Sequence, residues 1–377
     1  MTGRGLLDGV PLVDHHCHGV VGVALDRDRF ELLVTESARP APAGCTGFDS
    51  QIGFAIRRWC APVIGLEPHA SADDYLAQRA RLGVGEVNRR LLGATGVAEF
   101  LVDSGYQTYD MLGPAEMADA AGARAAEVVR LEAVAERVAL NGTGAGDFAT
   151  AYAEALDVSA PDAVGLKSII AYRYGLDIPP ERPSALEVRD AAGRWLRQVD
   201  GTGAARLADP VLLRHVLWVG VDRGLPIQFH VGFGDSDLTL DRCDPARMTD
   251  FLRAVQPRDI AIMLLHCYPF HRQAGYLAQV FPNVYMDVGL AVNYVGARAA
   301  AVIGESLELA PFHKVLYSSD AFGLPELHYL GAALFRRAFD EVVGGWIAAG
   351  LWSAPDAERV ARMVGAGNAE RVYGVRR

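Results

Sequence analysis

The feature that most constrains the fold is the regular alternation of short apolar runs with segments of helical periodicity along the whole chain. This alternation is typical of a parallel sheet whose strands are joined by crossover helices. Eight runs are candidate strands, and eight parallel strands close a (β/α)8 TIM barrel. The runs begin at Val10, Val97, Val128, Ala163, Leu225, Ile260, Asn283 and Lys314. The sequence therefore predicts an α/β fold of the TIM-barrel class.

A length of 377 residues fits either one large barrel or two to three smaller domains. Two connections are longer than the others, about 22–95 after the first predicted strand and about 178–208 before the fifth. Neither has the pattern of a separate core, so we expect one domain over 1–377 with a helical insertion after strand 1. In a barrel, such an insertion lies above the carboxyl ends of the strands, where it can cover a site.

Charge and cysteine content narrow the classes of partner. With 46 Asp and Glu against 36 Lys and Arg, a polyanion would find few cations, so we expect no nucleic-acid partner. The five cysteines are scattered and form no CxxC pair, which favours a reducing cytoplasm over a disulfide framework. The N-terminal residues lack the pattern of a signal peptide, and no run reaches the roughly 18 apolar residues of a membrane span. We expect a soluble cytoplasmic protein that does not bind membranes.

The first predicted strand carries polar side chains at alternating positions, Asp14, His16 and His18. A period of two puts all three on one face of the strand, so His16 and His18 can converge on one ion. By the same rule His15 and Cys17 point the other way, which excludes His15 from the metal and places Cys17 in the core.

Three further side chains stand at the C-terminal tips of predicted strands, namely His230, His266 and Asp320. Barrel enzymes place their catalytic groups at this end of the strands. Neutral imidazoles and a carboxylate are ligands that Zn²⁺ accepts, and a position left open for water makes such a site catalytic. A metal lowers the pKa of water to about 7, and a nearby carboxylate, here Asp320, can remove a proton and return it to a leaving group.

Other polar residues near strand ends have two interpretations each. Arg173, in the loop after the fourth strand, is either a forked clamp for a substrate carboxylate or an ordinary surface arginine. Tyr172 either lines the pocket or packs against the core. Asp287, in the seventh strand, is a candidate for orienting a ligand histidine. We expect His271 and His328, which follow the sixth and eighth strands, at the surface.

Several stretches of the chain are similar to one known family: GLKSIIAYRYGL, PIQFHVGFGDSDLTL, LLHCYPFHRQAGYLAQVFPNVYMDVGLA and LYSSDAFGLPELHYLGA. The sequence resembles the amidohydrolase superfamily of metal-dependent TIM-barrel hydrolases and, within it, the amidohydrolase-related domains found fused to glutamine-synthetase-like domains. The resemblance implies that His16, His18 and His230 bind the metal. It also implies that Asp320 binds or flanks the metal and shuttles the proton. His266 would bind a second ion or polarise the substrate carbonyl.

The resemblance leaves the state of Lys167 open. Binuclear members of the superfamily carry a carbamylated lysine at this position, which bridges two ions. A charged lysine would instead repel a metal and pair with a substrate carboxylate. We expect one divalent ion, with Zn²⁺ favoured, and two ions if Lys167 is carbamylated.

Three functions are compatible with these residues. The first is hydrolysis of a C–N amide or an ester by metal-activated water, and the fused relatives point to a γ-glutamyl or other carboxylate-bearing small substrate. The second keeps the same site in a metal-dependent non-oxidative decarboxylase. The third is a metal-containing protein that binds or regulates without turnover. The sequence decides neither the substrate nor the oligomeric state, and a homo-oligomer is one option.

Overall fold

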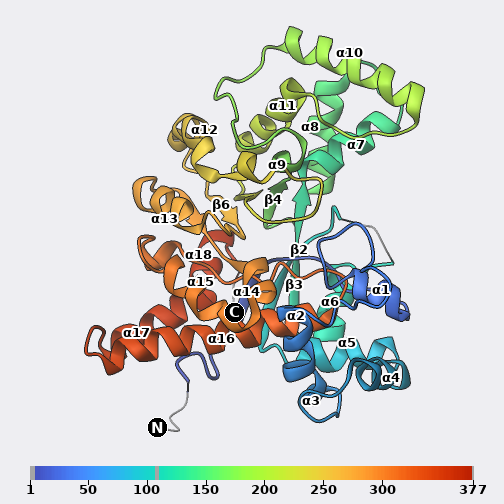
Figure 1. The fold of residues 1–377 in the computed structure, drawn as a ribbon. Coiled ribbons are helices and arrows are strands. Elements are labelled where there is room, and N and C mark those ends of the chain that lie inside the picture. The colour runs from blue at the N-terminus through green and yellow to red at the C-terminus, as the bar shows by residue number, and fades with distance from the viewer. Residues whose placement is uncertain (1–4, 107–109, 376–377) are drawn as a thin grey trace.

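A computed structural model describes residues 5–106 and 110–375 of the chain. In this part of the chain, seven strands form one parallel sheet in sequence order (Figure 1). The curled sheet with its surrounding helices is TIM-barrel-like, which confirms the predicted α/β class. The strands are β1 (Leu12–Cys17), β2 (Val97–Asp103), β3 (Arg124–Arg130), β4 (Gly165–Ser168), β5 (Ile227–His230), β6 (Ile262–Leu265) and β7 (Val284–Met286).

The predicted eighth strand, from Lys314, does not form a regular strand. The segment nevertheless makes hydrogen bonds to both edges of the sheet. The amide of Leu316 donates to the carbonyl oxygen of Met286 in β7 at 3.0 Å, and the amide of Asp320 donates to that of His16 in β1 at 3.0 Å. The segment therefore lies between β7 and β1.

A side chain interrupts the ladder that would make this segment a strand. The amide of Ser319 donates to the Asp14 carboxylate at 2.9 Å instead of to a backbone carbonyl. The next residue, Asp320, has a φ of 47°, in the left-handed region that strands do not use. Regular strand pairing is therefore lost at Ser319 and Asp320.

The third strand begins earlier than its sequence pattern predicts. We expected it to start at Val128, whereas β3 covers Arg124–Arg130 and is followed directly by helix α7 (Leu131–Leu140). Apolar residues in this helix recur at the spacing of one helical face, which is the stronger signal over these residues. The buried members of that face are Leu131, Val134, Ala135 and Val138.

Helices fill the connections and surround the sheet (Figure 1). The long connection after β1 holds α1 (Arg27–Leu32), α2 (Gln51–Ala55), α3 (Ala61–Val63), α4 (Ala72–Leu82) and α5 (Val84–Gly93). The connections up to β5 hold α6 (Pro114–Ala121), α7, α8 (Phe148–Ser159), α9 (Ile170–Arg173), α10 (Ala185–Thr202) and α11 (Pro210–Asp222). The remaining helices are α12 (Thr249–Val255), α13 (His271–Val280), α14 (Gly289–Val295), α15 (Ala299–Ser306), α16 (Pro325–Ala348), α17 (Ala354–Arg362) and α18 (Asn368–Tyr373). Short 3-10 and π turns link several of them.

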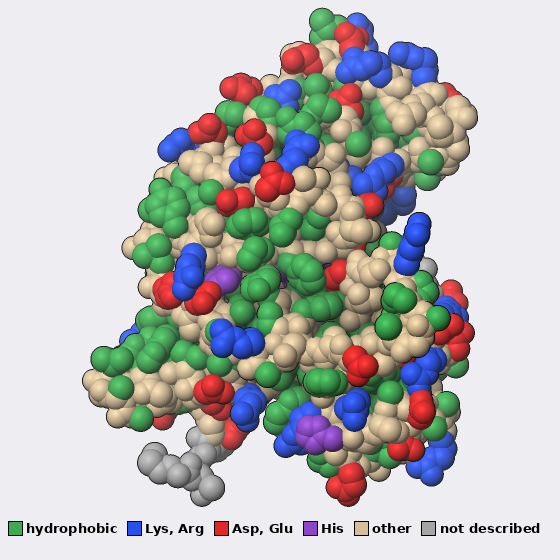
Figure 2. Space-filling view, in the orientation of Figure 1, with side chains coloured by type: hydrophobic (Ala, Val, Ile, Leu, Met, Phe, Trp, Pro, Cys, Tyr) green, Lys and Arg blue, Asp and Glu red, His purple; other side chains and the backbone are tan. Residues whose placement is uncertain are grey.

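The apolar core has two parts. The larger part lies between the sheet and the helices, and a smaller cluster includes Val13 of β1, Leu101 of β2 and Met263 of β6. Helix α18 contributes Tyr373 to the smaller cluster. Among the described residues, none of the helices combines the length and apolar character needed to cross a membrane. Acidic and basic side chains are interspersed on the face shown in Figure 2.

Candidate metal centre and substrate cavity

Strand β1 presents His16 and His18 through an irregular stretch of backbone. The register between β1 and β2 shifts between Asp14 and Cys17, and such a shift breaks the alternation of side chains. The prediction that Asp14 shares one face with the two histidines is therefore wrong. Its carboxylate instead accepts hydrogen bonds from the amide and hydroxyl of Ser319, at 2.9 and 2.5 Å.

His16, His18 and Asp320 meet at the carboxyl edge of the sheet. The Nε2 atoms of His16 and His18 lie 3.1 and 3.7 Å from Oδ1 of Asp320, and the three donor atoms are all within 4.8 Å of one another. Burial lowers the pKa of His16 well below its usual value and that of His18 to about 4. Both rings are therefore neutral at pH 7, which is the form that binds metal.

His230 and His266 lie beside this group. Their ring centres are 4.8 Å apart, and Nδ1 of His266 is 3.2 Å from Oδ2 of Asp320. Nε2 of His230 is buried and has no hydrogen-bond partner among the described residues. An unpartnered buried nitrogen costs free energy, which a bound cation would recover. Histidine and carboxylate donors gathered in this way fit a divalent metal ion.

Asp320 is the acid at the centre of the group. Burial raises its pKa well above the usual range, and the nearby charge of Lys167 acts in the opposite direction. A bound divalent cation would hold the carboxylate ionised, because the ion is the largest local charge in such a site.

Gln228 of β5 orients the ring of His16. Its Oε1 accepts a hydrogen bond from Nδ1 of His16 at 2.8 Å, which directs Nε2 of His16 toward Asp320. Its Nε2 donates to the carbonyl oxygen of His15 at 2.7 Å and to the hydroxyl of Tyr373 at 2.8 Å. Gln228 is not among the predicted site residues, although it stands two residues before His230 and thus on the same face of β5.

His15 and Asp287 pair with each other and not with the candidate ligands. Nε2 of His15 lies 2.9 Å from Asp287, and its Nδ1 lies 3.0 Å from the hydroxyl of Tyr373. Both ring nitrogens of His15 are thus engaged away from the cluster. We expected Asp287 to orient a ligand ring, but its carboxylate accepts a hydrogen bond from the backbone amide of His266 at 2.9 Å. It therefore positions the backbone of His266.

A cavity of about 470 Å³ opens onto the cluster and is lined by His18, His230, His266 and Asp320, among others. Lys167 also lines it, with Nζ 3.3 Å from Nε2 of His16, and burial lowers the pKa of Lys167 to about 8.

Tyr172 also lines this cavity, and its ring centre lies 4.4 Å from that of His230. Residues of the segment 32–38, from the long connection after β1, form another part of the wall. That the helical insertion as a whole covers the site stays a prediction.

Three arginines line the cavity, namely Arg130, Arg173 and Arg206. Arg173 pairs with Glu136 at 3.2 Å, but its Nε and Nη1 atoms are buried without a partner among the described residues. Arg173 is thus a cavity residue with unused donors. Arg130, at the end of β3, pairs with Asp103 at 2.6 Å and also lines the cavity. Arg130 escaped prediction because the third strand was expected to begin at Val128, which puts Arg130 inside the strand and not at its end.

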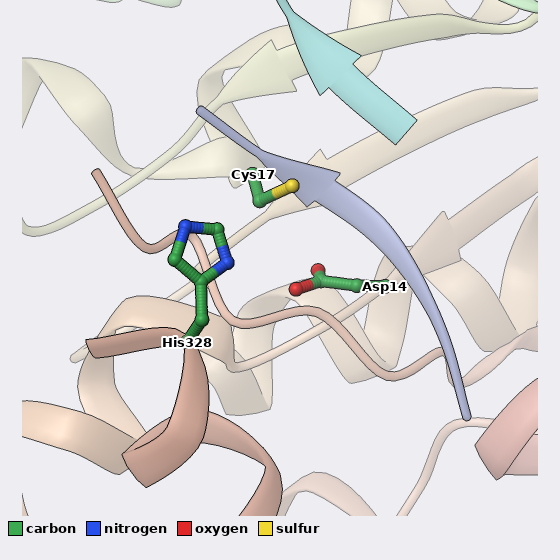
Figure 3. A group of neighbouring side chains, drawn as sticks. All are labelled: Asp14, Cys17 and His328. Atoms are coloured by element: carbon green, nitrogen blue, oxygen red, sulfur yellow. The ribbon is translucent and has the colours of Figure 1, made fainter. Parts of the chain in front are cut away.

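The expected surface positions of His271 and His328 are wrong, because both side chains are buried. Nε2 of His271 lies 2.5 Å from the Glu305 carboxylate. His328 projects from α16 toward Asp14 and Cys17 on β1 (Figure 3), and the donor atoms of these three residues also lie within 4.8 Å of one another. None of the three lines the cavity, and Cys17 is buried in the core as expected.

A curled parallel sheet with histidines and an acid at its carboxyl edge defines a TIM-barrel-like protein with a candidate metal centre. The amidohydrolase family model matches residues 171–375, more than half of the chain. The chain therefore belongs to the amidohydrolase family, which confirms the resemblance seen in the sequence. The expected relation to domains fused with glutamine-synthetase-like partners stays a prediction.

Three similar proteins add detail. Protein fluG of Emericella nidulans is 32% identical over 229 residues, which make up 57% of this chain and 26% of that protein. This chain thus spans about a quarter of the length of that relative. A Lactobacillus casei protein, provisionally classed as a metal-dependent hydrolase, has a solved structure with 29% identity, a TM-score of 0.86 and 98% coverage of both chains.

A uronate isomerase of Bacillus halodurans is 15% identical, with a TM-score of 0.63 over 98% of this chain and 96% of that one. This likeness concerns the fold alone. Because an isomerase shares the fold, the architecture does not decide which reaction takes place. The family and the Lactobacillus casei structure together support a metal-dependent enzyme.

Proposed function

We propose that this protein is a metal-dependent hydrolase that cleaves a C–N amide or an ester bond in a small substrate carrying a carboxylate. The observation that carries the proposal is the meeting of His16, His18 and Asp320 beside a cavity that is also lined by cationic side chains. Family membership supports the same class of chemistry.

His16, His18, His230 and Asp320 would hold one divalent ion, and the imidazole and carboxylate donors suit Zn²⁺. When bound, the ion polarises the substrate carbonyl and makes water a stronger nucleophile at neutral pH. Asp320 accepts the proton of the attacking water and then donates it to the departing nitrogen or oxygen. Hydrolysis thus balances as amide plus water giving acid plus amine, with no redox partner.

His266 is placed to act on the substrate carbonyl. Its ring is neutral because burial lowers its pKa, so it carries one N–H donor. Neither ring nitrogen of His266 has a hydrogen-bond partner among the described residues, so in the tautomer with its proton on Nε2 the ring can donate to the carbonyl oxygen as negative charge develops there.

The substrate class that we propose is a γ-glutamyl amide or another carboxylate-bearing amide. Arg173 has two buried donors without a partner among the described residues, and Lys167 is a further cation of the cavity. A guanidinium matches the two oxygens of a carboxylate in a forked hydrogen bond. Tyr172 also lines the cavity, and its ring packs against that of His230. Lys167 then acts as a cation rather than as a carbamylated bridge between two ions.

The experiment starts from protein purified without added metal, with its metal content measured before and after chelation. A panel of amides and carboxylic acids is then assayed for release of amine and of CO2. We expect metal-dependent release of amine, which Asp320→Asn lowers by about 10² to 10⁴-fold. We also expect His16→Ala to lose the metal.

Asp241→Asn is the matched control, because Asp241 is exposed and does not line the cavity. Release of CO2 in place of amine would make the protein a decarboxylase. If Asp320→Asn kept the turnover rate of the wild-type protein, the proposed role of Asp320 as a proton shuttle would be refuted.

A further inference from the structure

One wall of the cavity carries a carboxylate that has no cation beside it. Glu36, in the segment after α1, lines the cavity, and its Oε1 accepts a hydrogen bond from the hydroxyl of Tyr294 in α14 at 2.9 Å. Among the described residues, no basic group lies within 4.0 Å of it. The proton of Tyr294 is thus the only donated hydrogen bond found for Glu36 in this part of the chain.

A second carboxylate stands near the first. Asp235, in the loop after β5, also lines the cavity and has no ion-pair partner in the part of the chain that the structure describes. Burial raises the pKa of Glu36 to about 7, and the charge of Asp235 adds to this effect. Asp237 in the same loop differs, because it pairs with Arg206 at 3.2 Å. Glu36 therefore has no counter-ion among the described residues, whereas the charges of Arg206 and Arg173 act on Asp235 without forming an ion pair with it.

Arg173, which has unused donors, comes from a different part of the curled sheet than Glu36. Arg173 follows β4, whereas Glu36 follows β1 and is held by Tyr294, which follows β7. In the strand order of the curled sheet, β4 lies across from the β7 and β1 edges. The side chain of Arg173 is only 10% exposed, yet two of its nitrogens have no partner among the described residues. The cavity therefore offers unused donors on Arg173 and, elsewhere on the curled sheet, an acceptor on Glu36 that has no ion-pair partner among the described residues.

We propose that the cavity recognises an amino-acid amide in its zwitterionic form, with Glu36 binding the ammonium group, Asp235 adding negative charge near it, and Arg173 binding the carboxylate. An ammonium group offers three donors, and hydrogen bonds between ions are roughly twice as strong as neutral ones. A single ammonium would also relieve the repulsion between the two desolvated acids. The cavity of about 470 Å³ lies in the usual range for a small-molecule site.

This inference rests on the proposed function, which supplies the bond that is cleaved. It concerns a different part of the substrate, the amino group. Proposed amide cleavage requires only the metal cluster and one carboxylate on the substrate. Recognition of an ammonium group makes Glu36 a determinant of specificity, and it predicts discrimination between substrates that differ only in an amino group.

The test compares γ-glutamyl anilide with glutaryl anilide, which lacks only the α-amino group, on the metal-loaded full chain. We expect wild-type protein to prefer the γ-glutamyl compound in kcat/KM by about 10- to 100-fold, the usual value of a hydrogen bond to a charged group. Glu36→Gln, which keeps an acceptor for Tyr294, should abolish most of this ratio, and Asp235→Asn should reduce it. Asp28→Asn removes an exposed acid from the preceding helix, outside the cavity, and should leave the ratio unchanged.

The outcomes separate the two proposals. Equal kcat/KM for both anilides in wild-type protein overturns ammonium recognition and leaves the hydrolase intact. If neither anilide is cleaved, the proposed hydrolase fails for this substrate class, and calorimetry then decides recognition. In that case, equal affinity for glutamate and glutarate overturns it, whereas tighter binding of glutamate that is lost in Glu36→Gln supports it.

Discussion

Replacing Gln228 by methionine tests whether the candidate metal site depends on the hydrogen bond that orients the ring of His16. The side chain of Gln228 makes three hydrogen bonds, with His16 Nδ1 at 2.8 Å, the His15 carbonyl at 2.7 Å and the Tyr373 hydroxyl at 2.8 Å. Methionine has nearly the same length and volume, so Gln228→Met removes these bonds with little change in packing.

The size of the effect follows from the partners that are left behind. Tyr373 keeps its hydrogen bond with His15 at 3.0 Å, so two buried groups lose their partner, the His16 N–H and the His15 carbonyl. At about 1–3 kcal/mol for each buried unsatisfied group, the free energy of unfolding falls by about 2–6 kcal/mol. Loss of a partner behind a ligand histidine also weakens metal binding by about 10- to 100-fold.

Two measurements check this prediction. Denaturant unfolding of metal-free protein gives the stability change, and competition with a chelator gives the metal affinity. Gln198→Met is the matched control, because Gln198 is exposed on α10. An unchanged metal affinity in Gln228→Met would refute the claim that Gln228 orients a ligand. An unchanged unfolding free energy would refute the hydrogen-bond account.

Two further predictions concern charged groups of the cavity. Arg173→Met should raise KM at least about 10-fold for a carboxylate substrate and leave its neutral methyl ester unaffected, as steady-state kinetics on the pair will show. Burial raises the pKa of Glu36 from 4.5 to about 7, so the folded protein resists its ionisation and loses stability as the pH rises through that window. Thermal melts should therefore show Glu36→Gln to be more stable than wild type at pH 8 but not at pH 4, and equal differences at both pH values would contradict this reasoning.

Local patterns were enough to find most of the candidate cluster. His230 ends β5, and His266 directly follows β6. The rule that parallel strands bring their carboxyl ends to one edge therefore places such residues together before any contact is known. The spacing of His16 and His18 predicts that they lie together. The strict alternation of side chains on which that prediction rests is broken by the register shift after Asp14.

Other features of the site had no local signal. Glu36 lies in an irregular segment without periodicity, and its place beside Tyr294 arises because residues 258 positions apart in the chain meet. The burial of His328 is similar. A long amphipathic helix can turn either side of one residue toward the core, and only the packing of α16 against β1 decides which.

By itself, the sequence determined the parallel α/β class, the strand ends that carry the candidate ligands and the family. Each of these depends on periodicities and motifs that a few consecutive residues express. Tertiary structure alone decided the register shift in β1, the support of His16 by Gln228 and the placement of Glu36 against Tyr294. These features depend on hydrogen bonds and ion pairs between distant segments, and such pairs form only when the sheet curls and brings the segments together.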